Sequence, residues 1–256
     1  GGALDAVATM DVVTLLIIVT IGYFLAGTIK GVAGIGLPTA AIGLTTLFLD
    51  PRSAVAVVLM PMIVLNAWQV WRSGQTTAAL RRYAPFIVVL MVGVALTSLL
   101  ASRVTDSALM GITGAVILLF VAVNLTVTLP QLPDRLDRPA QALAGLVAGI
   151  MGGLTAVWAP PLAIYLAARQ ADKDEFVRAS GLLILLGSLP LAASYVAQGL
   201  MTGWLALLSG AMILPALIGF TAGEALRARL SQERFRTVLM VVFLGLGLNL
   251  IRRAWF

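Results

Sequence analysis

Two matching sets of glycines in hydrophobic sequence could bind a ligand through the backbone. The spacing G-x3-G-x2-G occurs at Gly27, Gly31 and Gly34, and again at Gly145, Gly149 and Gly152. Proline follows each set, at Pro38 in the first half and at Pro160 and Pro161 in the second. Glycine lets a helix break and lets its backbone approach a ligand, and proline suits the first turn of a helix that restarts. A restarting helix exposes free N–H groups and the positive end of its dipole, so both motifs predict an anion site.

The predicted site combines the backbone around the two breaks. We expect the two helix ends to meet near the middle of a bilayer, because paired, Gly/Pro-interrupted segments in two halves indicate a transporter's substrate site. The backbone residues predicted to bind substrate are Gly31, Gly34, Gly36, Pro38, Gly149, Gly152, Gly153 and Pro160. Close packing between helices is the alternative role of glycines spaced in this way.

Three polar side chains and one aromatic side chain complete the predicted substrate site. Lys30 lies inside the first motif, and a lysine within apolar sequence is a functional candidate; extension to the cytoplasmic interface is its alternative role. Asn66 and Gln69 share a helix face and could donate amide N–H groups to an anionic oxygen. Trp158 shortly precedes Pro160 and could wall the pathway, although packing against lipid or core is equally compatible with its position.

Glu224 is the candidate for carrying a coupling proton. It follows Gly223 at the end of an apolar run, and an ion pair with Arg227, one helical turn further on, is the alternative. The chain contains neither cysteine nor histidine. Disulfides, thiolate or imidazole metal sites, haem ligation and Ser-His or Cys-His catalysis are therefore excluded, and we expect no metal and no cofactor.

The composition requires a membrane around the elements that carry these residues. The 256 residues are 60% hydrophobic and 11% charged, whereas soluble domains carry about 25% charged residues. Continuous apolar runs without alternation predict an all-α, polytopic membrane protein. The net charge of +6 comes from basic residues in short loops, which is typical of topology signals and argues against nucleic-acid binding.

Ten apolar runs divide the chain into two halves of similar layout. The runs are 11–29, 31–49, 53–71, 84–101, 107–129, 140–154, 155–168, 179–198, 203–222 and 236–251. The stretch 140–168 is too short for two full crossings and predicts half-helices or a re-entrant hairpin. We therefore expect a first transmembrane repeat at 1–130, a connecting loop at 131–139 and a second repeat at 140–256.

The distribution of charge predicts that the two repeats are inverted. If the arginine-rich loop 72–82 is cytoplasmic, thirteen basic residues lie on the cytoplasmic side and four on the other side. The matching loop of the second half, 198–203, has no basic residue, whereas the weakly charged loop 103–106 is matched by the arginine-rich loop 227–236. Matching loops thus lie on opposite faces, so we expect two inverted five-segment repeats with broken or short helices at the start of each. Eight crossings with parallel repeats are the alternative, which would spoil the charge bias.

The glycine-rich segments resemble those of the TauE/SafE family of bacterial permeases, the sulfite exporter group. The resemblance is carried by GTIKGVAGIGLPTAAIGL (27–44), AGLVAGIMGGLTAVWAPPLAIYL (144–166), DPRSAVAV (50–57) and RSGQ (72–75), and it covers essentially the whole chain. It implies transport of sulfite, a sulfonate such as sulfoacetate, thiosulfate or a similar organic anion across the bacterial inner membrane. The resemblance also implies that the direction of transport is export and that transport is coupled to protons.

We therefore expect a secondary transporter whose partners are a small anion and the lipid bilayer, with a homodimer left open. A passive anion channel and a non-catalytic membrane scaffold subunit are the alternative functions. An enzyme is disfavoured, because the chain lacks histidine, cysteine and an acidic pair within the apolar runs.

Overall fold

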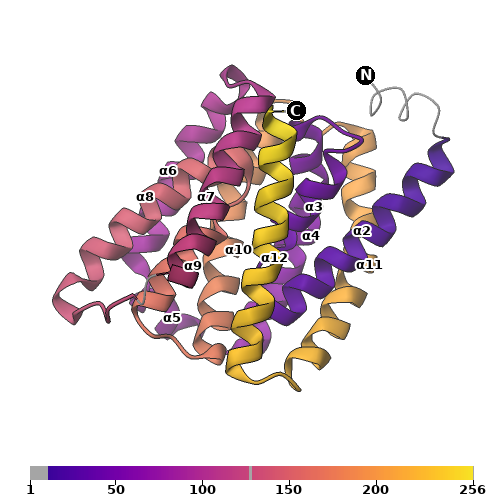
Figure 1. The fold of residues 1–256 in the computed structure, drawn as a ribbon. Helices are drawn as coiled ribbons and strands as arrows, with labels where there is room; N and C mark the ends of the chain where they lie inside the picture. Colours follow the sequence, from indigo (N-terminus) through magenta and orange to yellow (C-terminus); the bar gives the residue numbers. More distant parts are fainter. Residues whose placement is uncertain (1–10, 127–128, 256) are drawn as a thin grey trace.

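Every secondary-structure element that the structure describes is helical, as the apolar runs predict. The computed structural model describes residues 11–126 and 129–255, whose helices pack side by side (Figure 1). The eleven α-helices are α2 (Val12–Ala33), α3 (Leu37–Thr45), α4 (Pro51–Ser73), α5 (Thr76–Arg82), α6 (Ala84–Leu100), α7 (Asp106–Thr126), α8 (Asp137–Thr155), α9 (Ala159–Ala168), α10 (Lys173–Ala197), α11 (Gly203–Arg227) and α12 (Gln232–Trp255).

Six of the described helices are long and apolar enough to cross a membrane. They are α2, α4, α6, α10, α11 and α12. Large apolar side chains such as Leu207 on α11 and Val241 on α12 are exposed on the outside of the bundle. Lipid is the environment that such a surface requires. The chain is therefore a multi-pass membrane protein.

Polar caps decide where the long helices begin. The side chain of Asp50 accepts a hydrogen bond from the Ser53 amide at 3.1 Å, and Pro51 occupies the first position of α4. Asp172 caps α10 in the same way through the Glu175 amide at 2.8 Å. Because such caps satisfy N–H groups that a helix leaves free at its start, both of these crossings begin at the polar edge of their apolar stretches.

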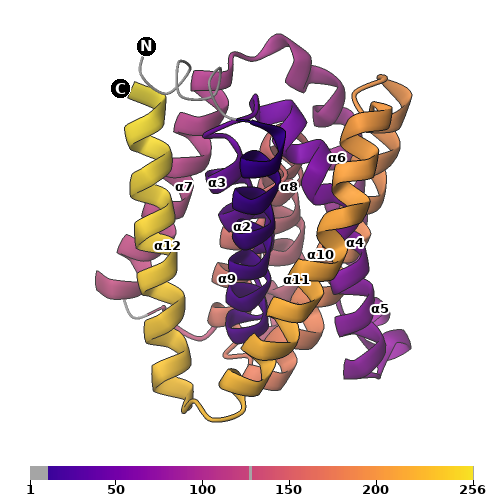
Figure 2. The ribbon, with the colours of Figure 1, turned by 90° about the vertical axis from the view of Figure 1, so that its right-hand side faces the viewer.

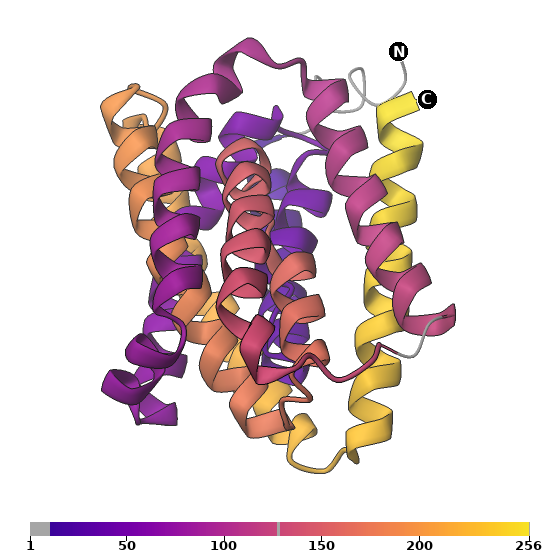
Figure 3. The same ribbon diagram turned by 90° about the vertical axis from the view of Figure 1, so that its left-hand side faces the viewer.

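The helices α4 and α10 lie at the centre of the bundle. In each of them 61% of the apolar stretch is buried, against 39% or less in the other four spans. Around this centre α2 packs along α11, α8 along α6, and α7 along α12. Figure 2 looks onto α2 and α11, and Figure 3 looks onto α6 and α8 on the opposite side.

Basic residues gather at one end of the bundle. Figure 1 places α5, the loop 169–172 and the loop 228–231 at the lower end, and the C-terminal end of α12 at the upper end. Twelve of the 17 lysines and arginines belong to the lower end, four belong to the upper end, and Lys30 lies between them. We call these the arginine-rich end and the arginine-poor end. The positive-inside rule assigns the arginine-rich end to the cytoplasm.

Three segments differ from the sequence prediction. The first run is predicted to end at residue 29, but α2 continues to Ala33, because Gly27 and Gly31 lie inside the helix and pack on α11 instead of breaking it. The second interruption lies at 156–158, a few residues beyond the predicted boundary at 154–155. The predicted loop 72–82 contains α5, a helix of seven residues.

Candidate functional site

The first broken helix turns at two glycines. The helix α2 ends at Ala33, and Gly34 and Gly36 follow with φ angles of 79° and 107°, which are left-handed values that glycine adopts readily. The Gly34 amide donates to the Lys30 carbonyl oxygen at 2.6 Å and closes the last turn. The chain then reverses into α3, with Pro38 in its first turn. The predicted break therefore exists, at Gly34–Gly36.

The second broken helix turns without a glycine. The helix α8 ends at Thr155, and Ala156 takes the left-handed conformation with φ at 62°. The Thr155 hydroxyl oxygen accepts the Val157 amide at 3.2 Å, and α9 begins after Trp158 with Pro160 and Pro161 in its first turn. The α3 and α9 helices have 9 and 10 residues, so each is about 15 Å long and cannot cross a bilayer alone.

The starts of α3 and α9 meet inside the protein. They share a small cavity of about 10 Å³, which we call the central cavity, lined by Pro38, Thr39, Ala156, Val157, Trp158, Ala159 and Ile184. Ile184 lies near the middle of α10, which places the central cavity at mid-depth in the bundle. Each helix start contributes a partial positive charge there. The structure thus brings the two predicted breaks together.

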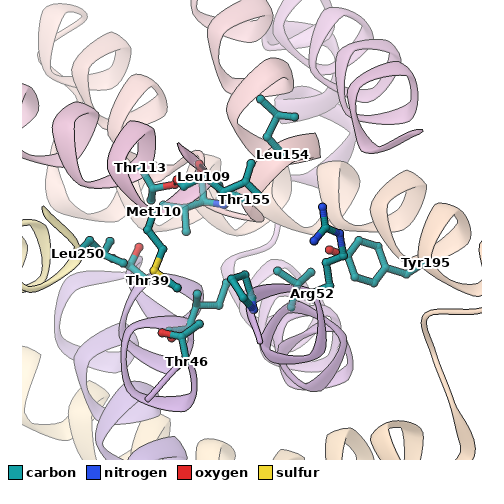
Figure 4. A pocket seen from close by; sticks show the side chains of 14 residues that line it. Thr39, Thr46, Arg52, Leu109, Met110, Thr113, Leu154, Thr155, Tyr195 and Leu250 are labelled. Atoms are coloured by element: carbon teal, nitrogen blue, oxygen red, sulfur yellow. Dashed lines mark hydrogen bonds between the residues drawn. The ribbon is translucent and has the colours of Figure 1, made fainter. Parts of the chain in front are cut away.

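A second cavity, which we call the upper cavity, leads from this point toward the arginine-poor end. Its volume is about 30 Å³, enough for about two water molecules, and it shares Thr39 and Val157 with the central cavity. Figure 4 shows Thr39, Thr113 and Thr155 from three helices among its lining side chains, with Arg52 and Tyr195 further along. Apart from Thr46, the remaining lining side chains are apolar.

Two buried donors at the breaks have no protein partner. The Thr39 hydroxyl and the Trp158 indole Nε1 belong to side chains that are 1% and 2% exposed, and neither forms a hydrogen bond within the described part of the chain. Buried polar atoms are nearly always hydrogen-bonded in proteins. Both residues line the central cavity, and neither donor is occupied by a described protein group. Sequence reasoning selected Trp158 but missed Thr39, whose signal was its place beside Pro38 in the first turn of the restarting helix.

Lys30 is buried beside the first break instead of reaching the membrane surface. Its side chain is 1% exposed, and its Nζ donates to the Gly34 carbonyl oxygen at 3.0 Å and to Asn66 Oδ1 at 2.7 Å. The alternative of an extended, interfacial lysine is therefore wrong for this structure. Lys30 can stay buried because Asn66 on α4 and the turn at Gly34 supply hydrogen-bond acceptors, which the charged group would otherwise find in water.

The amides of Asn66 and Gln69 are bonded to backbone carbonyls. Asn66 Nδ2 donates to the Met62 oxygen at 2.7 Å. Gln69 Nε2 donates to the Val177 oxygen at 2.6 Å and more weakly to the Gly34 oxygen at 3.4 Å. Gln69 therefore joins α4 to α10 and to the first break, while Asn66 bonds to Lys30 and within α4.

A wider cavity, which we call the vestibule, lies between this cluster and the arginine-rich end. Its volume is about 270 Å³, and it is lined by Gln69, Arg72, Ser73, Asp174, Val177, Arg178, Glu224 and Arg227. Glu224 pairs with Arg72 at 2.5 Å and with Arg227 at 3.4 Å. The structure thus places the proton-carrier candidate in an ion-pair network, with the predicted Arg227 contact and an additional one to α4. Within the described ranges, acidic side chains form no group of three or more that could hold a metal ion.

Most of the motif glycines lie at contacts between helices. A Cβ on Gly31 would lie 2.3 Å from the Phe220 oxygen, and one on Gly149 would lie 2.9 Å from the Cα of Gly93. Cβ atoms on Gly152 and Gly153 would collide with Trp158 and Thr97. These positions allow close helix packing. The predicted residues at the breaks themselves are Gly34, Gly36, Pro38, Trp158 and Pro160.

The Tyr83 side chain connects the start of α6 to α10 at the arginine-rich end. The Tyr83 hydroxyl donates to Glu175 on α10, and Glu175 also pairs with Arg178 at 2.8 Å. Burial raises the pKa of Tyr83 above the usual tyrosine value, and the hydrogen bond to Glu175 adds to the increase. The phenol therefore stays protonated and holds the start of α6 against α10.

Comparison with known proteins gives one result that bears on this geometry. The family described as sulfite exporter TauE/SafE matches residues 19–250, a range that includes both breaks, both cavities and the vestibule. Neither a curated protein nor a solved structure gave a significant match. Because the match covers most of the 256 residues, the chain belongs to the TauE/SafE family of sulfite exporters.

Proposed function

We propose that this protein is a secondary transporter that exports a small sulfur-containing or organic anion, such as sulfite or sulfoacetate, with coupling to protons. The observation that carries the proposal is the meeting of two helix starts at a buried, mid-depth cavity. Free N–H groups and the positive ends of two helix dipoles suit a negatively charged substrate. Family membership supports a small anion as the substrate class.

The proposal includes two inverted repeats, at 1–130 and 140–256. Its support is the parallel order of elements, in which a long helix, a short reversed helix and three further long helices occur in each half. The pairings of α2 with α11 and of α8 with α6 are related by the same exchange of halves. The connections after α4 and α10 lie at opposite ends of the bundle, as inversion requires (Figure 1).

The proposed path runs from the vestibule past Gln69 and Lys30 to the central cavity, and then through the upper cavity. The cavities between the vestibule and the arginine-poor end are narrow, with about 10 and 30 Å³. Movement of one repeat against the other would widen one side while closing the other, which is alternating access around a fixed site.

Proteoliposomes that contain the purified protein test this function. We expect flux of sulfite and sulfoacetate at two pH values, with sulfate and a carboxylate as comparison anions. Gly34→Leu should abolish flux, because it forces a side chain into a left-handed turn at the break. Gly199→Leu is the matched control, since Gly199 also has a positive φ but lies in a loop with open space around it. Equal flux in both variants would contradict the proposed site.

The same liposomes distinguish a carrier from a channel. A coupled carrier accumulates the anion against its own gradient when a proton gradient is imposed, whereas a passive channel only dissipates the anion gradient. Absence of any anion flux from the purified protein would favour the scaffold alternative.

A further inference from the structure

The vestibule contains two buried guanidinium donors that no described protein group uses. Arg178 on α10 donates from Nη1 to Glu175 at 2.8 Å, but its Nε atom is buried and forms no hydrogen bond within the described part of the chain. Arg227 at the end of α11 donates from Nη2 to Glu224 at 3.4 Å, and its Nη1 atom is likewise buried and unbonded among the described residues. Buried polar atoms are nearly always hydrogen-bonded, and arginine nitrogens can only donate. The two free donors are therefore suited to an acceptor that the protein itself does not supply.

Neighbouring contacts hold both guanidinium groups in place. The Arg178 and Arg227 side chains are 22% and 13% exposed, so neither extends freely into solvent. Glu175 and Glu224 each bind one nitrogen of these groups, and Lys173 donates to the Arg227 carbonyl oxygen at 3.0 Å and thereby joins α10 to α11. Because side chains that are already ordered lose little conformational freedom on binding, the free donors are preorganised for a ligand.

The charge of the vestibule lining favours an anion. Its ionisable side chains are three arginines and two carboxylates, namely Arg72, Arg178, Arg227, Asp174 and Glu224. Glu224 is shared between Arg72 and Arg227, so one carboxylate faces two guanidinium groups. Asp174 opposes an anion, but it is exposed, so solvent screens its repulsion. The volume of about 270 Å³ leaves room for a small organic anion with its hydrating water.

The inner wall of the vestibule reaches the first break. Gln69 lines the vestibule, and its Nε2 donates to the Val177 oxygen at 2.6 Å and to the Gly34 oxygen at 3.4 Å. The Gln69 side chain therefore lies between the vestibule and the turn that precedes α3. An anion in the vestibule would have this side chain between it and the first break.

We propose that the vestibule is a second anion-binding site, in which Arg178 Nε and Arg227 Nη1 bind a small oxyanion before it reaches the central cavity. The inference rests on the proposed function and deepens it by naming a capture site at the arginine-rich end. Guanidinium groups bind the oxygens of carboxylates and phosphates, and sulfite and sulfonates present the same kind of acceptor. Donors from two helices suit an anion with several acceptor oxygens, whether it carries one negative charge or two.

Protection of a single thiol localises the bound anion. The chain has no cysteine, so Ser73→Cys places one thiol on the vestibule wall. The rate of its reaction with N-ethylmaleimide is measured on the purified protein in detergent, with increasing sulfoacetate and with chloride at matched ionic strength. We expect sulfoacetate to slow the reaction and chloride to leave it nearly unchanged. The control is Ser231→Cys, an exposed position in the loop 228–231 outside the vestibule, where sulfoacetate should give no protection.

Charge variants in the Ser73→Cys protein test the two donors. Arg178→Gln and Arg227→Gln should each raise the sulfoacetate concentration for half protection by at least about tenfold, because each removes a charge-assisted hydrogen bond. Asp174→Asn should lower that concentration by about threefold, since it removes a repelling charge. The matched control is Arg82→Gln, which also takes an arginine from Glu175, at 3.5 Å, but does not line the vestibule, and should change the concentration by less than about twofold.

The results separate this inference from the function on which it rests. Anion flux in proteoliposomes without protection of the Ser73→Cys thiol would overturn the capture site and leave the transporter proposal standing. Equal effects of Arg82→Gln and Arg178→Gln would also overturn it, because Glu175 alone would then explain the loss. An anionic lipid carries the same kind of oxygen, so protection by phosphatidylglycerol but not by sulfoacetate would identify a lipid-headgroup site instead. Protection without any anion flux would support the binding site and refute the transporter proposal.

Discussion

Asn66→Asp should switch off anion transport by giving Lys30 an internal counter-charge. The two side chains have nearly the same shape, and the Asn66 oxygen already lies 2.7 Å from Lys30 Nζ. A carboxylate at this position would form an ion pair inside the protein. The ammonium would then have no net charge to offer to a substrate.

The magnitude follows from the distance and the burial. Two unit charges 4 Å apart attract by about 4 kcal/mol at an effective dielectric constant of 20, and the 2.7 Å separation makes the attraction larger. Desolvation of the new carboxylate costs several kcal/mol, and loss of the Asn66 bond to the Met62 oxygen costs about 1 kcal/mol more. The net change in the free energy of unfolding is therefore small. The anion, by contrast, loses its charged partner, which corresponds to about 2 kcal/mol or more, or at least about thirtyfold in affinity.

The assay compares sulfite flux and thermal unfolding for Asn66→Asp and Asn66→Leu. The leucine variant removes an acceptor of a charged group, which should lower the free energy of unfolding by about 1.5–3 kcal/mol. It leaves the charge of Lys30 uncompensated, so a substrate anion still binds. The aspartate variant should therefore be stable and inactive, and the leucine variant less stable but active.

The opposite pattern would refute the reasoning. If Asn66→Asp transports sulfite with wild-type affinity, the charge of Lys30 does not act on the substrate. If Asn66→Leu loses all flux while it remains folded, Asn66 itself contacts the substrate, as the sequence first suggested.

Three further variants probe packing, the free hydroxyl and pH. Gly31→Ala should lower the free energy of unfolding by about 1–3 kcal/mol in a thermal unfolding assay, because its Cβ would lie 2.3 Å from a carbonyl oxygen of α11. The control is Gly245→Ala, which has open space around its Cβ and should be tolerated. Thr39→Val should reduce flux by up to about tenfold and leave stability unchanged or higher, because the Thr39 hydroxyl has no protein partner. The control is Thr45→Val, which removes a hydroxyl that is bonded within α3 and should leave flux unchanged. Because the pKa of Tyr83 is raised in the folded state, its contribution to stability is full below the ordinary tyrosine value of about 10 and declines above it. Tyr83→Phe should therefore make the alkaline loss of stability shallower in a pH series of unfolding measurements, and the part contributed by the other buried tyrosines should stay.

The sequence predicts the position of a helix break only where the residues at the break themselves favour the turn. At the first break, Gly34 and Gly36 adopt left-handed backbone angles and Pro38 restarts the helix, so the motif itself gives the location. At the second, Ala156 takes the left-handed angle four residues after Gly152. The glycines of the second motif pack against Phe86 and Gly93 on α6 and against the Trp158 ring instead. A glycine spacing cannot tell these two uses apart, because the neighbour that needs the space comes from elsewhere in the chain.

The burial of Lys30 could not be predicted from the order of residues. A count of loop charges assigns it to the cytoplasmic surface, because it falls between two apolar runs. Its acceptor Asn66 lies 36 residues further along the chain, and its other acceptor, the Gly34 carbonyl, is free only because α2 ends there. The composition, the charge bias and the pairing of the motifs depend on the chain as a whole, so they could be predicted. The partners of one side chain depend on which helices meet.

The two breaks are similar in backbone and different in charge, and packing explains the difference. Lys30 lies four residues before the left-handed residue Gly34, and the same count back from Ala156 reaches Gly152. A Cβ at Gly152 would lie only 2.7 Å from the Trp158 ring, so the second half has no room for a matching lysine. Each helix start adds about half a positive charge, whichever half it belongs to. Under the proposed mechanism, the two helix starts therefore provide donors from both sides, while only the first half adds a buried lysine beside its break.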